Sequence, residues 1–264
     1  MILNISVVKI LHMFSMAGVA EIMCKYGAGD KVLQLRQFDP FGFSEYYGVT
    51  ELFDDLYDLL KRTEQLVDKY DKIVIHDYCE FRTYFPKKKV ILVFHGTKLR
   101  EMSDDEKRAL EGYQCFVTTD DLLSLLPNSI HLPAPIDYDL FQKTDLPKEE
   151  SWIALNRGYQ REHIEPQIME KYPKTQYYER NNTNLVNYKD MPKFLSNYTD
   201  YVDMKYTYDK PNPKVTTFLS CTALQALALG LRVWNVLGQV ENRELNLILH
   251  EPNKVVREFL DKID

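Results

Sequence analysis

Short apolar runs alternate with stretches of helical composition along most of the chain, and this alternation constrains the fold more than any other feature. Parallel strands that are buried on both faces read as continuous apolar runs, and a crossover segment must carry the chain from one to the next. The sequence therefore predicts an α/β protein with parallel sheets and helices on both faces. Strands are expected at residues 5–14, 31–38, 70–78, 88–95, 114–117 and 129–137, and again at 151–156, 174–178, 200–204 and 231–236.

The segment at 49–70 has the pattern of an amphipathic helix. Its apolar residues fall on one side, with acidic residues on the other. A single helix over this segment is therefore expected. The residues that make up its apolar side are Leu52, Leu56, Leu59, Leu60 and Val67. Further helices are expected at 104–112, 160–171, 189–197 and 253–263.

Residues 217–236 predict a helix, a tight glycine turn and a largely buried parallel strand. Ser220 and Thr222 can cap the helix start, and Gly230 stands where a left-handed C-terminal residue belongs. In a doubly wound sheet the amides at such a helix start face the ligand crevice and can hold an anion. The alternative is an ordinary helix–strand unit that binds no ligand.

A polar segment at 145–150, which contains Pro147, is the predicted linker between two domains. The chain has 264 residues, enough for two domains that each bury a core. The expected division is an N-terminal Rossmann-like domain at 1–147 and a C-terminal Rossmann-like domain at 148–264.

Composition narrows the functional classes. Lys and Arg number 33 against 39 Asp and Glu, a formal net charge of -6 that argues against non-specific nucleic-acid binding. The four cysteines form no CxxC pair, which favours a reducing, cytoplasmic setting over a disulfide framework or a structural zinc site. No run reaches the length of a membrane span, and neither a signal peptide nor a span is expected.

Several motifs together resemble glycosyltransferases of the GT-B fold, in particular the family 4 group. They are HDY at 76–78, HGTKLR at 95–100, the run from TTDDLL at 118–123 to LPAPID at 132–137, DYVDMK at 200–205, and TALQALALGLRVW at 222–234. The resemblance implies two facing Rossmann-like domains with a cleft between them. It also implies an acceptor held mainly by the first domain, a sugar nucleotide held mainly by the second, and transfer with retention of configuration.

On the acceptor side, the resemblance and the residue chemistry point to one catalytic candidate. His95 follows a buried strand and would bring an imidazole to the crevice, while His76 and Asp77 close the preceding strand. Either histidine could instead be a satisfied structural residue. The remaining acceptor-side candidates are Gly18, Gly96, Thr97 and Arg100.

On the donor side, Arg157 and Arg161 are the expected phosphate-binding cations, because charge develops on the leaving diphosphate during transfer. The alternative is that both are solvated residues at the start of a helix. Asp203 and Lys205 close another strand and can line the site, or they can form a surface ion pair. The other donor-side candidates are Asn156, Ser220, Cys221, Thr222 and Gln225. No Asp-x-Asp motif ends a strand and no GxGxxG follows the first strand, so neither a metal nor a redox cofactor is expected.

The chain departs from the family pattern at the two positions where a pair of glutamates is typical. These positions are Thr217 and Gln225. Gln225 can still hydrogen-bond hydroxyl groups, whereas Thr217 lacks the charge and reach of glutamate. Three classes therefore stay open: an active glycosyltransferase, a non-catalytic module that binds a sugar nucleotide or glycan, and an unrelated two-domain α/β protein such as an epimerase or a binding protein.

The sequence also suggests partners. A nucleotide-sugar donor is expected, with an acceptor that is a glycan, a lipid-linked sugar or a protein. The three lysines at 87–89 could approach an anionic membrane surface, or they could form a solvated loop.

Overall fold

The computed structural model describes residues 8–156, 169–179, 185–204, 206–207, 214–215, 219–235 and 238–263. The chain divides into two compact units, one formed by Met1–Pro135 with Pro252–Asp264 and the other by Ile136–Glu251. This division differs from the expected boundary at 147 in two places. The first unit ends earlier, and the C-terminal helix groups with the first unit instead of the second.

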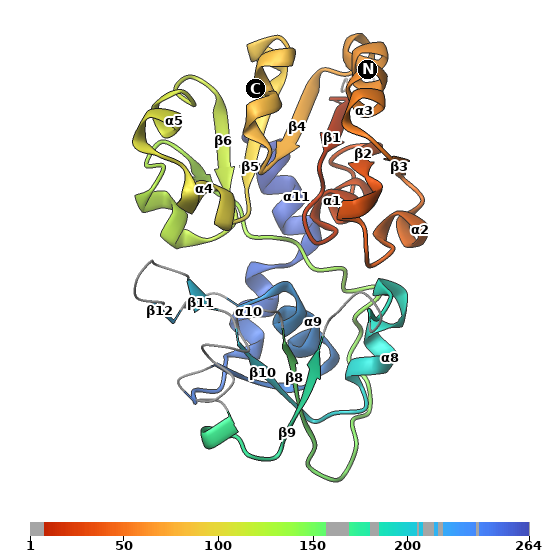
Figure 1. Cartoon of the computed structure of the whole chain (residues 1–264). Coiled ribbons are helices and arrows are strands. Elements are labelled where there is room, and N and C mark those ends of the chain that lie inside the picture. The colour runs from red at the N-terminus through yellow and green to blue at the C-terminus, as the bar shows by residue number, and fades with distance from the viewer. Residues whose placement is uncertain are drawn as a thin grey trace, which may run out of the picture. The chain divides into compact units, whose positions relative to one another are not determined.

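The first unit contains a seven-stranded parallel sheet (Figure 1) with the order β3-β2-β1-β4-β5-β6-β7. Strand order runs outward from β1 in both directions, through β2 and β3 on one side and through β4 to β7 on the other. This order is Rossmann-like, as the alternation of strands and helices in the sequence predicted. The strands are β1 (Ile10–Met13), β2 (Lys31–Leu35), β3 (Thr50–Phe53), β4 (Lys72–His76), β5 (Val90–Phe94), β6 (Gln114–Val117) and β7 (Ile130–His131).

Helices cover both faces of this sheet, because successive side chains along each strand point to opposite sides. Leu11 and Met13 of β1 join a core with α3 and α4, whereas Ile10 joins a core with α1 and α11. The helices of this unit are α1 (Val19–Lys25), α2 (Phe43–Tyr47), α3 (Leu56–Leu66), α4 (Thr97–Glu101), α5 (Asp104–Arg108) and α11 (Pro252–Leu260). Val255, Val256 and Phe259 bury the apolar side of α11 in this core, which explains why the helix belongs to the first unit.

The single helix expected at 49–70 is wrong in its first part. Residues Thr50–Phe53 form β3, which pairs in parallel with β2. The helix starts only after Asp55, whose side chain accepts a hydrogen bond from the amide of Asp58 at 2.9 Å. Leu52 fits the helical spacing, but pairing with the edge of the sheet overrides that local pattern. The helices α2 and α10 were not predicted.

The second unit contains a four-stranded parallel sheet with the order β13-β10-β8-β9 and a separate two-stranded antiparallel pair. Its strands are β8 (Trp152–Asn156), β9 (Thr175–Glu179), β10 (Asp200–Asp203) and β13 (Arg232–Asn235), with β11 (Tyr206–Thr207) and β12 (Lys214–Val215) forming the pair. Its helices are α8 (Met191–Leu195), α9 (Cys221–Leu229) and α10 (Arg243–Leu249). The helix expected at 160–171 lies mostly outside the described residues.

The predicted helix–glycine–strand unit is confirmed, with one correction. Ser220 caps α9 by accepting from the amide of Ala223 at 3.1 Å, and Gly230 ends the helix with a φ of 105°. Strand β13 then runs parallel to β10. It is not largely buried, because it lies at the end of the strand order and exposes Arg232; only Val233 is fully buried.

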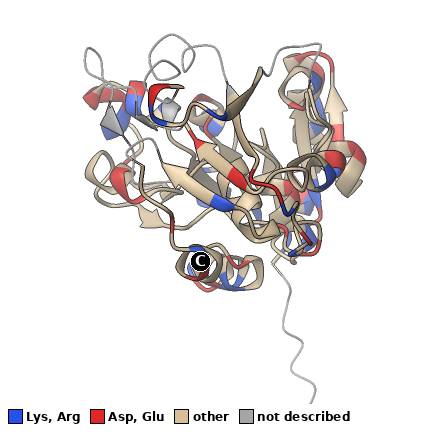
Figure 2. Cartoon of the chain, turned by 90° about the horizontal axis from the view of Figure 1, so that it is seen from below, with Lys and Arg blue, Asp and Glu red and all other residues tan. Residues whose placement is uncertain are grey.

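Charged residues of both signs are mixed along the helices and loops, while the strand ribbons carry few of them (Figure 2). The four cysteines are free thiols. In the part of the chain that the structure describes, no helix is long and apolar enough to cross a membrane.

Candidate functional site

Three histidines form a continuous chain of hydrogen bonds across the centre of the first sheet. His12 lies in β1, His76 ends β4 and His95 follows β5, so they come from three neighbouring strands. His12 Nδ1 is 3.0 Å from His76 Nε2, and His76 Nδ1 is 2.9 Å from His95 Nε2. At the inner end, His12 Nε2 is 2.5 Å from the carbonyl oxygen of Ala28. The structure thus joins the two predicted histidines to a third that the sequence analysis did not select.

Burial sets the charge of the two inner rings. His12 and His76 are fully buried. Burial lowers the pKa of His12 to about 4, although the Ala28 carbonyl and Asp30 act in the opposite direction. Burial also lowers the pKa of His76 well below its ordinary value, and the neighbouring His95 and His12 add to that shift. Both rings are therefore neutral at pH 7, and His95 is the member that reaches the half-buried rim.

Asp77 holds the other side of His95. Its carboxylate Oδ1 accepts from the backbone amide of His95 at 2.8 Å. Asp77 is buried, and burial raises its pKa, while His95, Lys98 and Arg100 oppose that rise. Its backbone adopts the left-handed region with a φ of 57°, a conformation that costs free energy and often occurs at functional sites.

The loop after β1 is similarly constrained. Phe14 and Ala17 have φ angles of 60° and 52°, and Gly18 has a φ of 77° at the start of α1. A Cβ on Gly18 would lie 2.3 Å from the ring of Phe43, so the close packing also requires glycine. Gly18 therefore shapes the turn at the carboxyl end of β1.

The segment after β5 is tied to the segment after β6. Gly96 precedes α4 with a φ of 138°, and Thr97 is the first residue of that helix. Arg100 donates from Nε to the Asp121 carboxylate at 3.2 Å and also pairs through Nη2. Asp121 also accepts from the hydroxyl of Thr119 at 2.6 Å. Arg100 is thus an ion-pair partner that links the HGTKLR and TTDDLL motifs.

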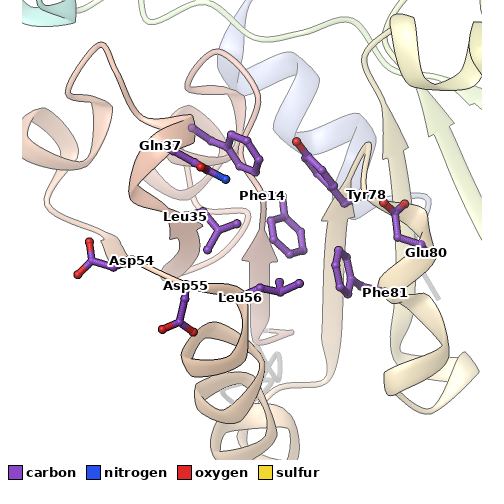
Figure 3. A pocket seen from close by; sticks show the side chains of 10 residues that line it. Phe14, Leu35, Gln37, Asp54, Asp55, Leu56, Tyr78, Glu80 and Phe81 are labelled. Atoms are coloured by element: carbon purple, nitrogen blue, oxygen red, sulfur yellow. The ribbon is translucent and has the colours of Figure 1, made fainter.

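A pocket of about 300 Å³ opens at the carboxyl ends of β1, β2, β3 and β4 (Figure 3). The ring of Phe14 lies at its centre, with ring centroids 4.9 Å from Tyr78 and 5.0 Å from Phe81, and Phe38 stacks on Tyr78 at 5.2 Å. Sequence analysis missed this pocket. An aromatic residue shortly after the ends of both β1 and β4 was the available signal. The complete lining is Phe14, Leu35, Gln37, Phe38, Asp54, Asp55, Leu56, Tyr78, Glu80 and Phe81.

The charged residues that line this pocket are all acidic, and each has a contact of its own. Asp54 pairs with Arg36 at 2.8 Å, and Glu80 lies 3.5 Å from Lys98. Asp55 caps α3. The lining therefore combines aromatic rings with partly compensated carboxylates, which disfavours an anionic occupant.

In the second unit, Asp203 lies at the end of β10 and contacts the start of α9. Its carboxylate accepts from the Ser220 amide at 2.8 Å, and Asp203 is buried. Burial raises the pKa of nearby Glu241, and the charge of Asp203 adds to the shift. Thr222 and Gln225 are buried in α9, whereas Cys221 is partly exposed.

The other predicted donor-side residues are only partly covered by the structure. Arg157, Arg161, Lys205 and Thr217 lie outside the described residues, as does the side chain of Asn156. The geometry described on this side is therefore that of Asp203 and α9.

The three lysines at 87–89 lie before β5, at the edge of the sheet opposite His95. Lys87 donates to the carbonyl of Glu111 at 2.9 Å, and Lys89 donates to the carbonyls of Val67 and Tyr70 at 2.8 and 2.9 Å. Two of these lysines thus bind backbone carbonyls within the first unit.

Among the described residues, no group of three or more His, Cys, Asp or Glu is arranged to hold a metal ion. Comparison with protein-family models and with curated proteins found no match to the chain.

Proposed function

We propose that the chain is a glycosyltransferase of GT-B-like organisation that moves a sugar from a nucleotide-sugar donor to an acceptor, with retention of configuration. The observation that carries this proposal is the position of His95. It ends the histidine chain at the carboxyl edge of a Rossmann-like parallel sheet, and its amide is bound to Asp77. In open α/β sheets this edge is where ligands bind. The two facing domains and their cleft, with the acceptor on the first unit and the donor on the second, are part of the proposal.

The reaction needs a group that can handle a proton at this edge. The bond between the anomeric carbon and the diphosphate oxygen breaks, the acceptor oxygen forms the new bond, and the acceptor hydroxyl gives up its proton. A neutral imidazole can accept that proton or a hydrogen bond from the hydroxyl. His95 is assigned this role, and the diphosphate takes the electron pair of the broken bond.

The aromatic pocket supports a sugar as the acceptor group. Rings such as Phe81 and Tyr78 suit the apolar face of a sugar, and carboxylates accept hydrogen bonds from its hydroxyls. The acidic lining repels phosphate and carboxylate groups. The acceptor is therefore proposed to be an uncharged or cationic glycan, free or as the sugar part of a lipid-linked or protein-linked substrate.

On the donor side, the proposal assigns the diphosphate to Arg157 and Arg161. The Asp203 carboxylate at the start of α9 suits sugar or ribose hydroxyls better than phosphate oxygens, and its charge acts on Glu241 near the end of β13. Gln225 can replace a carboxylate as a hydroxyl partner through its amide. Neither a metal nor a further cofactor is required, and the proposed setting is cytoplasmic, with membrane contact open through the acceptor.

A second candidate is a non-catalytic module that binds a sugar nucleotide or glycan. One observation favours it in particular: the buried Asp203 carboxylate occupies the Ser220 amide at the start of α9, where the resemblance leads one to expect an anion from the donor. The replacement of both typical glutamates by Thr217 and Gln225 points the same way.

The deciding experiment is a thermal-shift panel of nucleoside diphosphates and their sugars, followed by assays of donor hydrolysis and sugar transfer. A ligand that binds only the folded state must raise the melting temperature. Binding with turnover that persists in a chelator supports the metal-independent enzyme. Binding without turnover on any acceptor or water supports the module. Failure of every nucleotide and nucleotide sugar to bind rejects the glycosyltransferase and the module that binds a sugar nucleotide.

A further inference from the structure

The direction of the hydrogen bonds in the histidine chain is decided at its buried end. A backbone carbonyl only accepts hydrogen bonds, so the 2.5 Å contact between His12 Nε2 and Ala28 O places a proton on Nε2. In a neutral imidazole the other nitrogen then carries the lone pair. His12 Nδ1 is therefore an acceptor, and His76 Nε2, 3.0 Å away, is its donor.

The same logic passes to the next ring. Because His76 donates from Nε2 and is neutral, its Nδ1 accepts, and the donor is His95 Nε2 at 2.9 Å. We propose that this chain holds neutral His95 as its Nε2–H tautomer and makes Nδ1 of His95 the atom at which a proton is taken up or released. His12 and His76 are then positioning residues that act through His95.

Gly29 makes the anchoring carbonyl accessible. It has a φ of 132°, and a Cβ there would lie 2.9 Å from His12 Nε2 and 2.8 Å from His12 Cδ2. Any side chain at this position would press on the ring of His12. The absence of a side chain thus allows the Ala28 carbonyl to approach His12, which is what sets the direction of the whole chain.

A proton accepted by His95 stays on His95. Passing it inward would break the Nε2–H bond of His95 and form an Nδ1–H bond on His76, then break the Nε2–H bond of His76 and form an Nδ1–H bond on His12. The positive charge would then lie on buried His12, which keeps its own Nε2–H. Burial opposes that charge strongly, which is why the pKa of His12 lies near 4. The chain therefore orients a base and does not conduct protons away from it.

The charged groups around this chain lie on several elements. Asp30 acts on His12, whereas Asp77, Lys98 and Arg100 surround the outer end, with Lys98 paired to Glu80 and Arg100 paired to Asp121. Only the identity of the hydroxyl-bearing ligand at Nδ1 rests on the proposed function. The tautomer assignment rests on the three distances and on the neutrality of the two buried rings.

The test is a long-range proton–nitrogen NMR spectrum of the ¹⁵N-labelled full chain at a pH well above the ordinary pKa of histidine. The chain has six histidines, which single substitutions assign. The expected result is the Nε2–H tautomer for all three rings of the chain. An Nδ1–H form, or an even mixture, at any of the three overturns the proposal, and this arm needs no variant that might fail to fold.

The second arm asks whether the inner ring controls the outer one. His12→Phe removes the acceptor of His76, and the tautomer ratio of His95 should shift toward Nδ1–H by roughly fivefold or more, as expected for one lost hydrogen bond. The matched control is His131→Gln in the same unit, where the imidazole contacts Asp120 at 2.8 Å. It should leave the ratio of His95 unchanged. An unchanged ratio in folded His12→Phe overturns the positioning role.

The NMR results and the nucleotide-binding results test different proposals, so failure of one can be told apart from failure of the other. If no nucleotide binds but the tautomers are as expected, the proposed function fails and the positioning chain stands. If nucleotides bind and the rings show mixed tautomers, the proposed function stands and the positioning role of the histidine chain fails.

Discussion

The backbone amide of His95 donates a hydrogen bond to the carboxylate of Asp77 at 2.8 Å, joining the end of β4 to the residue that follows β5. Asp77 makes this bond from a left-handed backbone conformation with a φ of 57°. Two strand ends are thereby held together at the point where the candidate site lies. Position 77 therefore needs a residue that adopts the left-handed backbone conformation and carries a side-chain oxygen that accepts from the His95 amide.

Asp77 is therefore predicted to tolerate asparagine better than alanine. Asparagine adopts the left-handed region readily and keeps a side-chain oxygen that can accept from the His95 amide. Asp77→Ala loses both and should lower the free energy of unfolding by about 2–3 kcal/mol, whereas Asp77→Asn should cost roughly 1 kcal/mol or less. Chemical denaturation of the two variants checks this. Equal losses would show that the bond to His95 contributes little.

His12 is predicted to make stability depend on pH in a defined window. Its folded-state pKa is lowered from 6.5 to about 4, so the unfolded chain binds the proton more readily. The corresponding stability is present above pH 6.5 and is lost as the pH falls toward 4, by an amount on the order of 3 kcal/mol.

The measurement for this prediction is denaturation from pH 7.5 to 4.5 for wild type, His12→Phe and His131→Gln. The difference in free energy of unfolding between wild type and His12→Phe should shrink or reverse as the pH falls. Phenylalanine has no group that binds a proton, so the variant lacks the loss of stability that protonation at this position causes in wild type. The same pH dependence in wild type and His12→Phe would contradict the assignment. His131→Gln controls for loss of an imidazole elsewhere in the unit.

Gly18 is predicted to be required for two separable reasons. Its φ of 77° disfavours other residues, and a Cβ would also lie 2.3 Å from the Phe43 ring. Gly48 offers a matched control, since its φ is 68° but a Cβ there would meet nothing within 4 Å. Gly48→Ala should cost about 1 kcal/mol, whereas Gly18→Ala should cost about 2–4 kcal/mol because the ring must move. Equal costs in denaturation would show that the ring of Phe43 yields freely.

The aromatic pocket is predicted to bind the sugar ring of the acceptor. Phe81→Leu keeps apolar volume but removes an aromatic face, and should weaken sugar binding roughly fivefold to tenfold. Tyr57→Ala, at a side chain that is 73% exposed on α3 and does not line the pocket, is the control. Ligand-observed NMR with neutral methyl glycosides and with a sugar phosphate measures both. Tighter binding of the phosphate than of the neutral sugars would contradict the acidic lining as the selecting feature.

His95 and Gln225 are predicted to affect different kinetic constants. Gln225→Ala should mainly weaken donor binding, because its amide contributes hydrogen bonds in the ground state. His95→Ala should lower kcat much more than donor affinity, since a group that acts chiefly in the transition state is read in the rate constant. Steady-state donor hydrolysis or transfer by both variants decides between them. Equal donor binding by wild type and His95→Ala, with no turnover in either, favours the non-catalytic module.

The sequence by itself determined those features that depend on neighbours along the chain. Apolar runs of strand length, separated by helical segments, predicted two parallel sheets and most of their strands. The cap at Ser220 and the left-handed Gly230 predicted both ends of α9, because caps and turns are set by local backbone chemistry. His76 and His95 were selected because each comes at the end of a buried strand.

Only the tertiary structure decided which distant residues meet. Thr50–Phe53 became a strand because the edge of β2 was there to pair with it, and α11 joined the first unit because its apolar side packs on the core beside α1. His12 joined the candidate site because β1 lies next to β4, which places its ring 3.0 Å from His76 although 64 positions separate them. The chemistry of each side chain can be read from the sequence at its own position. Hydrogen-bond partners across a sheet depend on strand order, which no local sequence pattern specifies.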